Sequence, residues 1–295
     1  MASVSFKPMA LAVVAAYSGR DLSFSARVQF WIDLWGDKDV ASLTTEDVED
    51  GIDLLAKKPK TVTRTTCDGI KFAASTDKTI SAATVNRYVA AIGTVFKDAR
   101  RMRLTPRGFV SPSRGAARMT EGPGRALTVT LDDVQRLLAA CRVSRNRNLA
   151  ALVAMAVTTG WRRGSLQALR WQDVDLKQGT ADTPRTKNGT PHRTPLLPWV
   201  VQELKQIRPD SPPPGALVFG AKSPHKAWQT ALQRADLPPW TFHHCRHIAA
   251  SILAQSGAST VTIMQALNHK TPMMAMRYSH LNTDALRESL GRAWG

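Results

Sequence analysis

The stretch Leu267-Asn268-His269-Lys270-Thr271-Pro272-Met273-Met274-Ala275-Met276-Arg277-Tyr278-Ser279-His280 decides how the rest of this chain is interpreted. It places a tyrosine nine residues after a histidine, near the C-terminus. Upstream lie two basic clusters, Gly160-Trp161-Arg162-Arg163 and His243-His244-Cys245-Arg246-His247. Arginines, histidines and a late tyrosine in acid-poor surroundings are suited to binding a phosphodiester and attacking it.

The chemistry follows from these residue types. The guanidinium groups of Arg162 and Arg246 are planar and permanently charged, so each can hold the non-bridging oxygens of a phosphate with paired hydrogen bonds. A phenol with a pKa of about 10 is a weak nucleophile at neutral pH, but nearby cations favour phenolate and an imidazole can accept its proton. Attack by Tyr278 then forms a covalent phosphotyrosine. Because this intermediate keeps the energy of the phosphoester, neither a cofactor such as ATP nor a metal is required.

In these segments the chain resembles the tyrosine recombinases of the phage-integrase type. The resemblance is carried, in chain order, by Thr159-Gly160-Trp161-Arg162 with the following Leu166–Asp175, Thr186-Lys187-Asn188 ahead of His192–Leu196, His243–His247, and Leu267–His280. It implies catalytic roles for Arg162, Lys187, His243, Arg246, His269 and Tyr278. The arginines and His269 would bind the phosphate, Lys187 would protonate the 5′-oxygen leaving group, and His243 would assist proton transfer at Tyr278.

Three positions depart from the usual pattern of that family. Ser165 stands where an acidic residue usually follows the first arginine, which removes a carboxylate that would support the arginine. Asn268 stands where glycine is common, and asparagine tolerates a left-handed backbone better than most residues. Cys245 replaces a common leucine, and we expect it to be a small buried apolar group. None of these changes removes a group that would touch phosphate, so we expect activity.

Composition agrees with a nucleic-acid partner. The chain has 295 residues, of which 43% are hydrophobic, enough for two domains with sizeable cores. Its net charge is +17 and its pI about 10.4, as expected for a protein that binds a polyanion. Charge alone does not distinguish DNA from RNA or a ribosome.

Cysteine usage and hydropathy indicate a cytoplasmic protein without a membrane partner, and the family resemblance implies that it acts on DNA at the nucleoid. The three cysteines, Cys67, Cys141 and Cys245, are widely spaced and odd in number, which favours a reducing cytosol. The apolar stretch Met9–Tyr17 is too short to span a bilayer. The cluster at 243–247 resembles a zinc site only superficially, because no second Cys/His pair lies at zinc-finger spacing.

We expect a mainly α-helical chain with a small β-sheet, an α+β fold. Its parts are an N-terminal extension (1–20), a helical core-binding domain (21–118), a linker (119–128) and a recombinase catalytic domain (129–295). Spacing and capping signals predict helices at Ser25–Trp35, Thr45–Leu55, Ser81–Arg103, Thr130–Cys141, Asn148–Thr158, Trp199–Ile207, Ala227–Ala235, His244–Ala254 and Thr260–Leu267. Extended segments are expected around Asp173–Asp175, Gly179–Thr183 and Arg193–Leu197, with an Asn-Gly hairpin at 187–190, while Ala216–Phe219 is ambiguous.

A basic stretch follows the apolar stripe of the helix expected at Ser81–Arg103. The stripe itself is best explained as core. The basic residues are Lys97, Arg100, Arg101, Arg103, Arg107, Arg114 and Arg118, in a stretch whose only acid is Asp98. They form either a solvated face or a nucleic-acid patch. The family resemblance implies that this domain clasps one side of the DNA.

The resemblance implies a site-specific recombinase of a phage or mobile element, which exchanges strands through a 3′-phosphotyrosyl intermediate and a Holliday junction. Its partners would be double-stranded DNA at two sites and three further copies of itself in a homotetramer. The segment Thr283–Trp294 has an apolar stripe that either packs on its own domain or docks on a neighbouring protomer, and the resemblance favours docking. Two alternatives remain open: a relaxing enzyme of topoisomerase type IB, and a DNA-binding protein that has lost catalysis.

Overall fold

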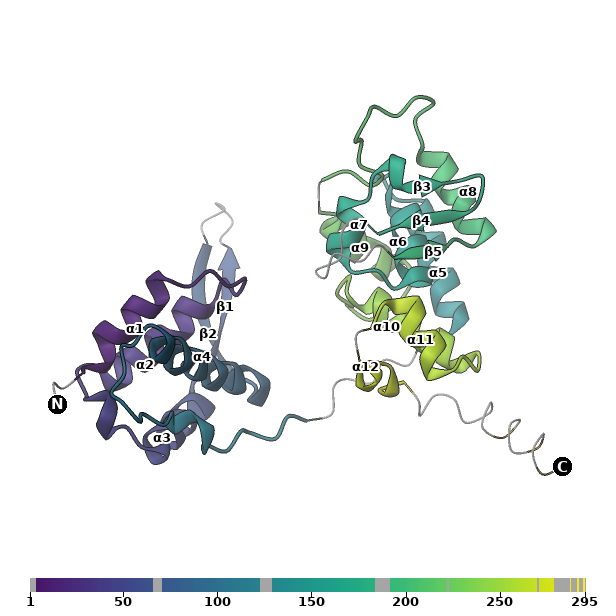
Figure 1. Ribbon diagram of the computed structural model, residues 1–295. Helices are drawn as coiled ribbons and strands as arrows, with labels where there is room; N and C mark the ends of the chain where they lie inside the picture. Colours follow the sequence, from purple (N-terminus) through teal and green to yellow (C-terminus); the bar gives the residue numbers. More distant parts are fainter. Residues whose placement is uncertain are drawn as a thin grey trace. The chain divides into compact units, whose positions relative to one another are not determined.

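The structure, a computed structural model, describes residues 4–65, 71–122, 129–183, 192–221, 223–269 and 271–278, together with residues 287, 291 and 294. It divides into two compact units, an N-terminal unit (Met1–Gly124) and a C-terminal unit (Arg125–Gly295) (Figure 1). Each unit has its own hydrophobic core. The division falls inside the segment 119–128 that was expected to be a linker.

The N-terminal unit is a helical bundle with one antiparallel ribbon. Its described part consists of α1 (Phe6–Ala15), α2 (Phe24–Trp35), a 3-10 turn (Val40–Ser42), α3 (Thr45–Lys57), β1 (Pro59–Thr65), β2 (Lys71–Thr79), α4 (Ala82–Arg101) and a 3-10 turn (Pro112–Arg114). α3 begins with a capping box in which Thr44 and Asp47 satisfy each other's backbone N–H groups. The apolar stripe of α4 is buried as core, as expected, through Val85, Val89, Ile92, Val95 and Phe96.

Two parts of this unit differ from the expectation. Residues 1–20 are not an extension before the domain, because they supply α1. Phe6, Met9 and Val13 are buried in the same core as α2 and α4, and the ring of Phe6 packs edge-on against Trp35 at 4.9 Å between centroids. The second difference is the ribbon of β1 and β2, which joins α3 to α4 where only helices were expected.

The C-terminal unit surrounds one central helix. Its described part consists of α5 (Leu131–Arg142), α6 (Leu149–Thr159), α7 (Arg163–Ala168), a 3-10 turn (Trp171–Asp173), β3 (Val174–Asp175), β4 (Thr180–Asp182), β5 (Arg193–Pro195), α8 (Pro198–Ile207), α9 (His225–Arg234), α10 (His244–Gln255), α11 (Thr260–Leu267) and α12 (Pro272–Met276). α6 is apolar on all sides and is buried against α5, α8 and α10, as expected for a helix without a polar face. The strands form a small antiparallel sheet in the order β3-β4-β5.

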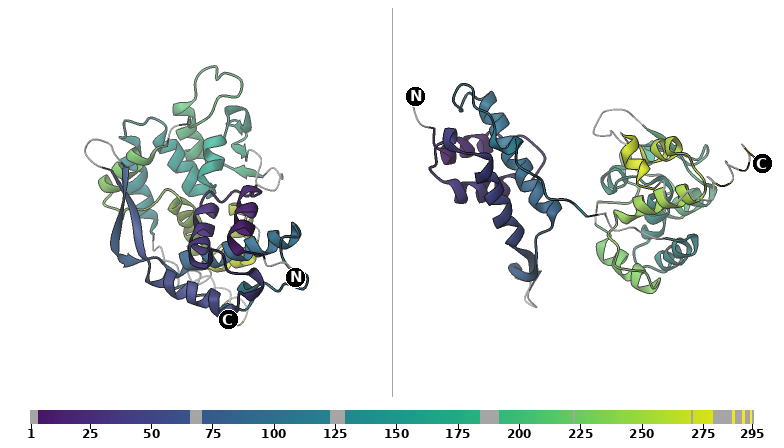
Figure 2. Two further views of the ribbon diagram at one scale, coloured as in Figure 1. Left: turned by 90° about the vertical axis from the view of Figure 1, so that its left-hand side faces the viewer. Right: turned by 90° about the horizontal axis from the view of Figure 1, so that it is seen from below.

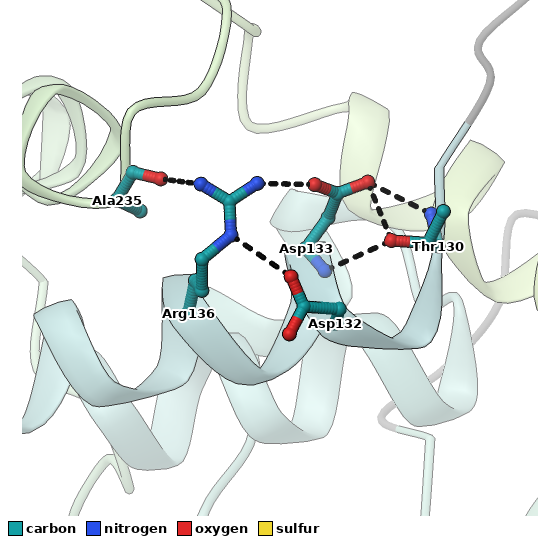
Figure 3. Close-up of polar contacts among 5 residues, drawn as sticks. All are labelled: Thr130, Asp132, Asp133, Arg136 and Ala235. Carbon is teal, nitrogen blue, oxygen red and sulfur yellow. Dashed lines mark hydrogen bonds and ion pairs between the residues drawn. The ribbon is translucent and has the colours of Figure 1, made fainter.

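α5 starts at a capping box that also ties it to the end of α9 (Figure 3). The Thr130 hydroxyl accepts a hydrogen bond from the backbone N–H of Asp133, and the Asp133 carboxylate accepts one from the backbone N–H of Thr130 at 2.9 Å. The hydrogen bond from the Thr130 backbone is the main reason why the pKa of Asp133 lies below its usual value. Arg136 donates to Asp132, to Asp133 and, at 2.6 Å, to the carbonyl of Ala235 (Figure 3). This contact fixes the end of α9, from which the chain continues into α10.

The fold is mainly α-helical with small sheets, as the sequence predicts. The expected helices of the C-terminal unit lie within one or two residues of α5, α6, α8, α9, α10 and α11. The ambiguous run Ala216–Phe219 forms no regular strand, and Leu217 pairs with Arg170 in an isolated bridge. The expected Asn-Gly hairpin at 187–190 lies outside the described residues. Across the described ranges, no helix is both long and apolar enough to cross a membrane.

Candidate active site

The first basic cluster lies at the junction of α6 and α7. α6 ends at the left-handed residue Gly160 (φ 60°), whose N–H donates to the Ala156 carbonyl. A Cβ at this position would lie 1.9 Å from Leu267 Cδ2 and 3.3 Å from Ala249 Cβ, so glycine fits both the backbone and the packing. Arg162 follows at the N-cap of α7 and is exposed. α10 and α11 are thereby packed against the turn that carries Arg162.

Arg246 enters the same region from α10 and is buried, with 7% of its surface exposed. Its Nη1 donates a hydrogen bond of 2.8 Å to the Gly160 carbonyl. Its Nη2 is buried and has no hydrogen-bond partner among the described residues. Burial, and then the charge of Arg162, lower the pKa of Arg246 to about 10, so the group stays charged at neutral pH. The guanidinium is held in place through one nitrogen, and another remains free to donate to a ligand.

His269 reaches this cluster from the end of α11. Asn268 ends that helix in the left-handed conformation (φ 51°, ψ 53°), and the backbone N–H of His269 donates to the Met264 carbonyl. Asparagine therefore fills the role for which glycine is common. Nδ1 of His269 is buried and unpartnered among the described residues. Burial, followed by the charges of Arg246 and Arg162, lowers the pKa of His269 to about 4, so its imidazole is neutral at neutral pH.

The hydroxyl of Tyr278 contacts a histidine of α10. Tyr278 lies just after α12, where its backbone N–H donates to the Ala275 carbonyl at 3.0 Å. Its hydroxyl oxygen lies 2.6 Å from Nδ1 of His247, which is half-buried and next to Arg246 in the chain. Burial raises the pKa of Tyr278, and the charges of Arg246 and Arg277 act in the opposite direction.

Protonation states decide the direction of this hydrogen bond. Burial lowers the pKa of His247, and its positive or titratable neighbours lower it further: His243, His244, Arg246 and Arg277. His247 is therefore a neutral imidazole at neutral pH and Tyr278 a neutral phenol. With both groups neutral, the tautomer of His247 decides: when its proton is on Nε2, the Tyr278 hydroxyl donates and Nδ1 accepts, which is the arrangement a general base needs.

His243 lies next to His247 on the same helix. It occupies the N-cap position of α10 and is exposed. Its ring is perpendicular to that of His247, with 5.3 Å between the centroids. Burial, and then Arg246, lower the pKa of His243. His247 makes the hydrogen bond to the Tyr278 hydroxyl that was expected to involve His243.

Comparison with protein-family models matches residues 128–285 to the family described as Phage integrase family. The chain belongs to the phage integrase family. It is 31% identical over 209 residues to the shufflon-specific DNA recombinase of Escherichia coli, an alignment that covers 70% of this chain and 53% of that protein. It is 28% identical over 212 residues to the integrase of Haemophilus phage HP1 (strain HP1c1), with 70% and 59% covered. The chain thus spans little more than half the length of these curated relatives.

A solved structure of a transposon integrase has the same fold. The integrase of the Tn1549 transposon, in complex with transposon right-end DNA, superposes with a TM-score of 0.71 at 13% identity and covers 98% of this chain and 99% of its own. At this identity the likeness supports the fold alone. The fold includes a helical N-terminal unit as well as the unit that carries Tyr278.

This phage integrase family member brings together the expected residues Arg162, His243, Arg246, His269 and Tyr278. The expected Lys187 lies outside the described residues. His247 was not among the expected site residues, although a signal for it exists in the sequence. Positions 243, 246 and 247 are spaced i, i+3 and i+4, which places them on one helix face. His244 makes no such contact with Tyr278: its Nδ1 accepts from the backbone N–H of Thr241 at 2.9 Å, and its ring centroid lies 6.0 Å from that of His247.

This phage integrase family member departs from the usual pattern at positions that add no acidic residue to the site. Within the part of the chain that the structure describes, the positive charge of the two arginines is therefore not neutralised by a neighbouring carboxylate. Ser165 is half-buried, and its backbone N–H donates to the Arg162 carbonyl at 2.9 Å. Among the described residues neither Arg162 nor Arg246 forms an ion pair with a carboxylate. Cys245 is buried, as expected, and burial raises the pKa of its thiol. Within the described ranges no group of three or more His, Cys, Asp or Glu side chains is arranged to hold a metal ion.

The basic residues expected to contact DNA are exposed in the N-terminal unit. They are Lys97, Arg100, Arg101, Arg103, Arg107 and Arg114. Arg101 pairs with Asp98 at 3.5 Å, a surface ion pair that contributes little stability and leaves the guanidinium accessible. Their contact with DNA stays a prediction.

Proposed function

We propose that this chain is a site-specific DNA recombinase, of phage or mobile-element origin, that cleaves and rejoins duplex DNA through a 3′-phosphotyrosyl intermediate. The supporting observation is the Tyr278 hydroxyl at 2.6 Å from a neutral imidazole, next to an arginine with a free buried nitrogen. The relatives agree with this assignment, since one is a DNA recombinase and another an integrase.

Phosphate fits the two buried groups that lack partners. Nη2 of Arg246 and Nδ1 of His269 are both buried without a hydrogen-bond partner among the described residues. Burying such a group without a hydrogen bond costs free energy, which a ligand that supplies the acceptor would recover. A non-bridging phosphate oxygen accepts from both groups, with His269 in the tautomer that carries its proton on Nδ1. Arg162, exposed beside them, supplies the second guanidinium. Together these groups stabilise the charge that develops on the phosphoryl group during transfer.

In the cleavage step the Tyr278 oxygen forms a bond to phosphorus, and the bond from phosphorus to the 5′-oxygen breaks. The phenol proton passes to Nδ1 of His247, and the 5′-oxygen takes a proton from Lys187. His243, whose ring packs against that of His247, keeps an auxiliary role in proton transfer. Rejoining reverses these transfers. One phosphodiester is exchanged for a phosphotyrosyl ester, so the reaction needs neither ATP nor a metal.

We further propose that the protein acts on double-stranded DNA as a homotetramer that holds two sites. The segment Thr283–Trp294, most of which lies outside the described residues, is assigned to docking on a neighbouring protomer because its sequence carries an apolar stripe. Truncation before Thr283 is expected to keep single-site DNA binding and to abolish synapsis. A truncated protein that still recombines two sites at the wild-type rate would rule out this role.

The test of the function is a covalent adduct that depends on Tyr278. The DNA site is first recovered by sequencing the junctions of the excised element, and a nicked duplex of that site then traps the cleaved intermediate. Tyr278→Phe keeps the ring and its packing but lacks the nucleophilic hydroxyl, so it is expected to bind DNA normally and form no adduct. An adduct in this variant would remove Tyr278 from the mechanism. An assay of strand exchange between two DNA sites distinguishes the two enzyme classes, because only a recombinase, and not a type IB topoisomerase, exchanges strands between sites.

A further inference from the structure

Among the described residues, one face of the ribbon of β1 and β2 is exposed. The register pairs Thr61 with Ser75 and Thr63 with Ala73, so these four residues share a face. All four are exposed. The opposite face, with Val62 and Ala74 at its centre, is only half-buried. A two-stranded ribbon with so little burial is marginally stable by itself in water, which suggests that it is retained for a contact outside the unit.

The base of the ribbon is fixed to the helices. The backbone N–H of Ile80 donates to the Lys58 carbonyl at 3.0 Å. The ammonium of Lys58 lies 5.6 Å from the ring centroid of Phe30 and 6.0 Å from that of Tyr88. Across the strands, the Thr76 hydroxyl donates to the Lys60 carbonyl at 2.9 Å. β1 and β2 run side by side and project away from the helices of their unit (Figures 1 and 2).

Charge is unevenly distributed along the N-terminal unit. Residues 57–79 contain six Lys/Arg and two Asp/Glu, whereas residues 1–56 contain four Lys/Arg and nine Asp/Glu. The ribbon is therefore not basic merely because the whole unit is basic. Lys57, Lys60 and Lys78 are exposed at its base. A positive ribbon attached to an acidic segment is complementary to a polyanion.

We propose that this ribbon binds duplex DNA through the hydroxyls of its exposed face and the lysines at its base, in addition to the basic stretch Lys97–Arg114. The side chains of Thr61, Thr63 and Ser75 are short and carry hydroxyls, and hydroxyls are common donors to DNA phosphates. Short side chains also allow close approach, and the major groove is wide enough for a two-stranded ribbon. The inference rests on the proposed function, because it takes duplex DNA as the partner.

The first test is the salt dependence of binding to a random-sequence duplex. Each phosphate contact that is lost lowers the slope of log affinity against log salt by about 0.9. The double variant Lys60→Gln, Lys78→Gln is expected to show this loss for each lysine. The double variant Lys7→Gln, Arg20→Gln removes the same charge from exposed positions outside the ribbon and is expected to keep the wild-type slope. Equal slopes in both variants, whether changed or unchanged, would overturn the proposal.

The second test identifies the occupant of the ribbon directly. A photo-crosslinking phenylalanine derivative at Thr63 is expected to crosslink to a labelled duplex. A crosslink to a second copy of the chain, or none at all, would overturn DNA as the occupant. The Tyr278 adduct is measured in parallel. Wild-type adduct formation with no ribbon crosslink refutes the ribbon assignment alone, whereas the absence of any adduct refutes the proposed function.

Discussion

Replacing His247 with asparagine is expected to slow DNA cleavage strongly without weakening DNA binding. A phenol with a pKa of about 10 is ionised to about one part in a thousand at neutral pH, and burial of Tyr278 lowers that fraction further. In the proposed mechanism the imidazole 2.6 Å away removes this penalty by taking the proton as the bond to phosphorus forms. We therefore expect a loss of about 10²–10³-fold, within the usual range of general-base catalysis. Asparagine keeps a short polar group near the position of Nδ1 but cannot take up the proton.

The pH profile distinguishes loss of a base from loss of packing. Protonated His247 cannot accept the phenol proton, so wild-type cleavage is expected to fall as pH drops through the pKa of His247. That pKa lies below the ordinary value of about 6.5, because burial and four neighbours disfavour the imidazolium: His243, His244, Arg246 and Arg277. The other titratable groups that face this site are His269 and Tyr278. In His247→Asn the acid limb of the profile is expected to disappear.

Single-turnover cleavage of a nicked recombination site measures both quantities. His225→Asn is the matched control, because His225 is an exposed histidine of the same unit that lies on α9 and not in the site. This control is expected to cleave at the wild-type rate. Wild-type cleavage by His247→Asn, with the acid limb retained, would refute the reasoning. Loss of that limb in His243→Asn instead would assign the base to His243.

Three further perturbations test other parts of the molecule. Lys187→Ala is expected to slow cleavage by about 10²–10⁴-fold, and a substrate with sulfur at the 5′-bridging position should restore the rate, because sulfur leaves without a general acid; failure of this rescue contradicts the assignment. Joint neutralisation of Arg100, Arg101 and Arg103 should lower the salt slope of duplex binding by about 0.9 per lost contact, and an unchanged slope would show that this face is merely solvated. Gly160→Ala should destabilise the C-terminal unit by roughly 2–4 kcal/mol in denaturant titration, through a left-handed backbone and a methyl that collides with Leu267 of α11. A change under about 1 kcal/mol would contradict both costs.

Helices could be predicted wherever their signals are local. Thr44 and Thr130 precede acidic first turns and cap α3 and α5 as expected. The ribbon could not be predicted by the same means, because a strand is recognised by alternation between a buried and an exposed face. The face of Val62 and Ala74 is only half-buried and the other face is exposed, so the sequence carries too weak an alternation to reveal the strands. α1 was missed as part of the core because its role depends on packing against Trp35, far along the chain.

Most of the site could be predicted because its residues lie in ordered motifs. Arg162, Arg246 and Tyr278 come together in one unit as the resemblance implies, and Lys187 stays a prediction. The partner of the tyrosine could not be predicted, since α10 presents several imidazoles within one turn. Only the packing of α12 against α10 and α11 shows that the hydroxyl contacts His247. The left-handed backbone of Asn268 was foreseeable, because few residue types tolerate it.

The hydrogen bond from Arg246 to the Gly160 carbonyl has a consequence for the energetics of DNA binding. Arg162 lies two residues beyond that carbonyl, so one turn of backbone sets the separation of the two guanidinium groups. The two guanidinium groups repel each other, and this repulsion contributes to the lowered pKa of Arg246. Its free-energy cost arises when the chain folds and not when the ligand binds. A phosphate bound between them relieves this repulsion. If DNA is the partner, as proposed, its phosphate would offset this positive charge, and even free phosphate or sulfate ions should raise the unfolding temperature of the C-terminal unit.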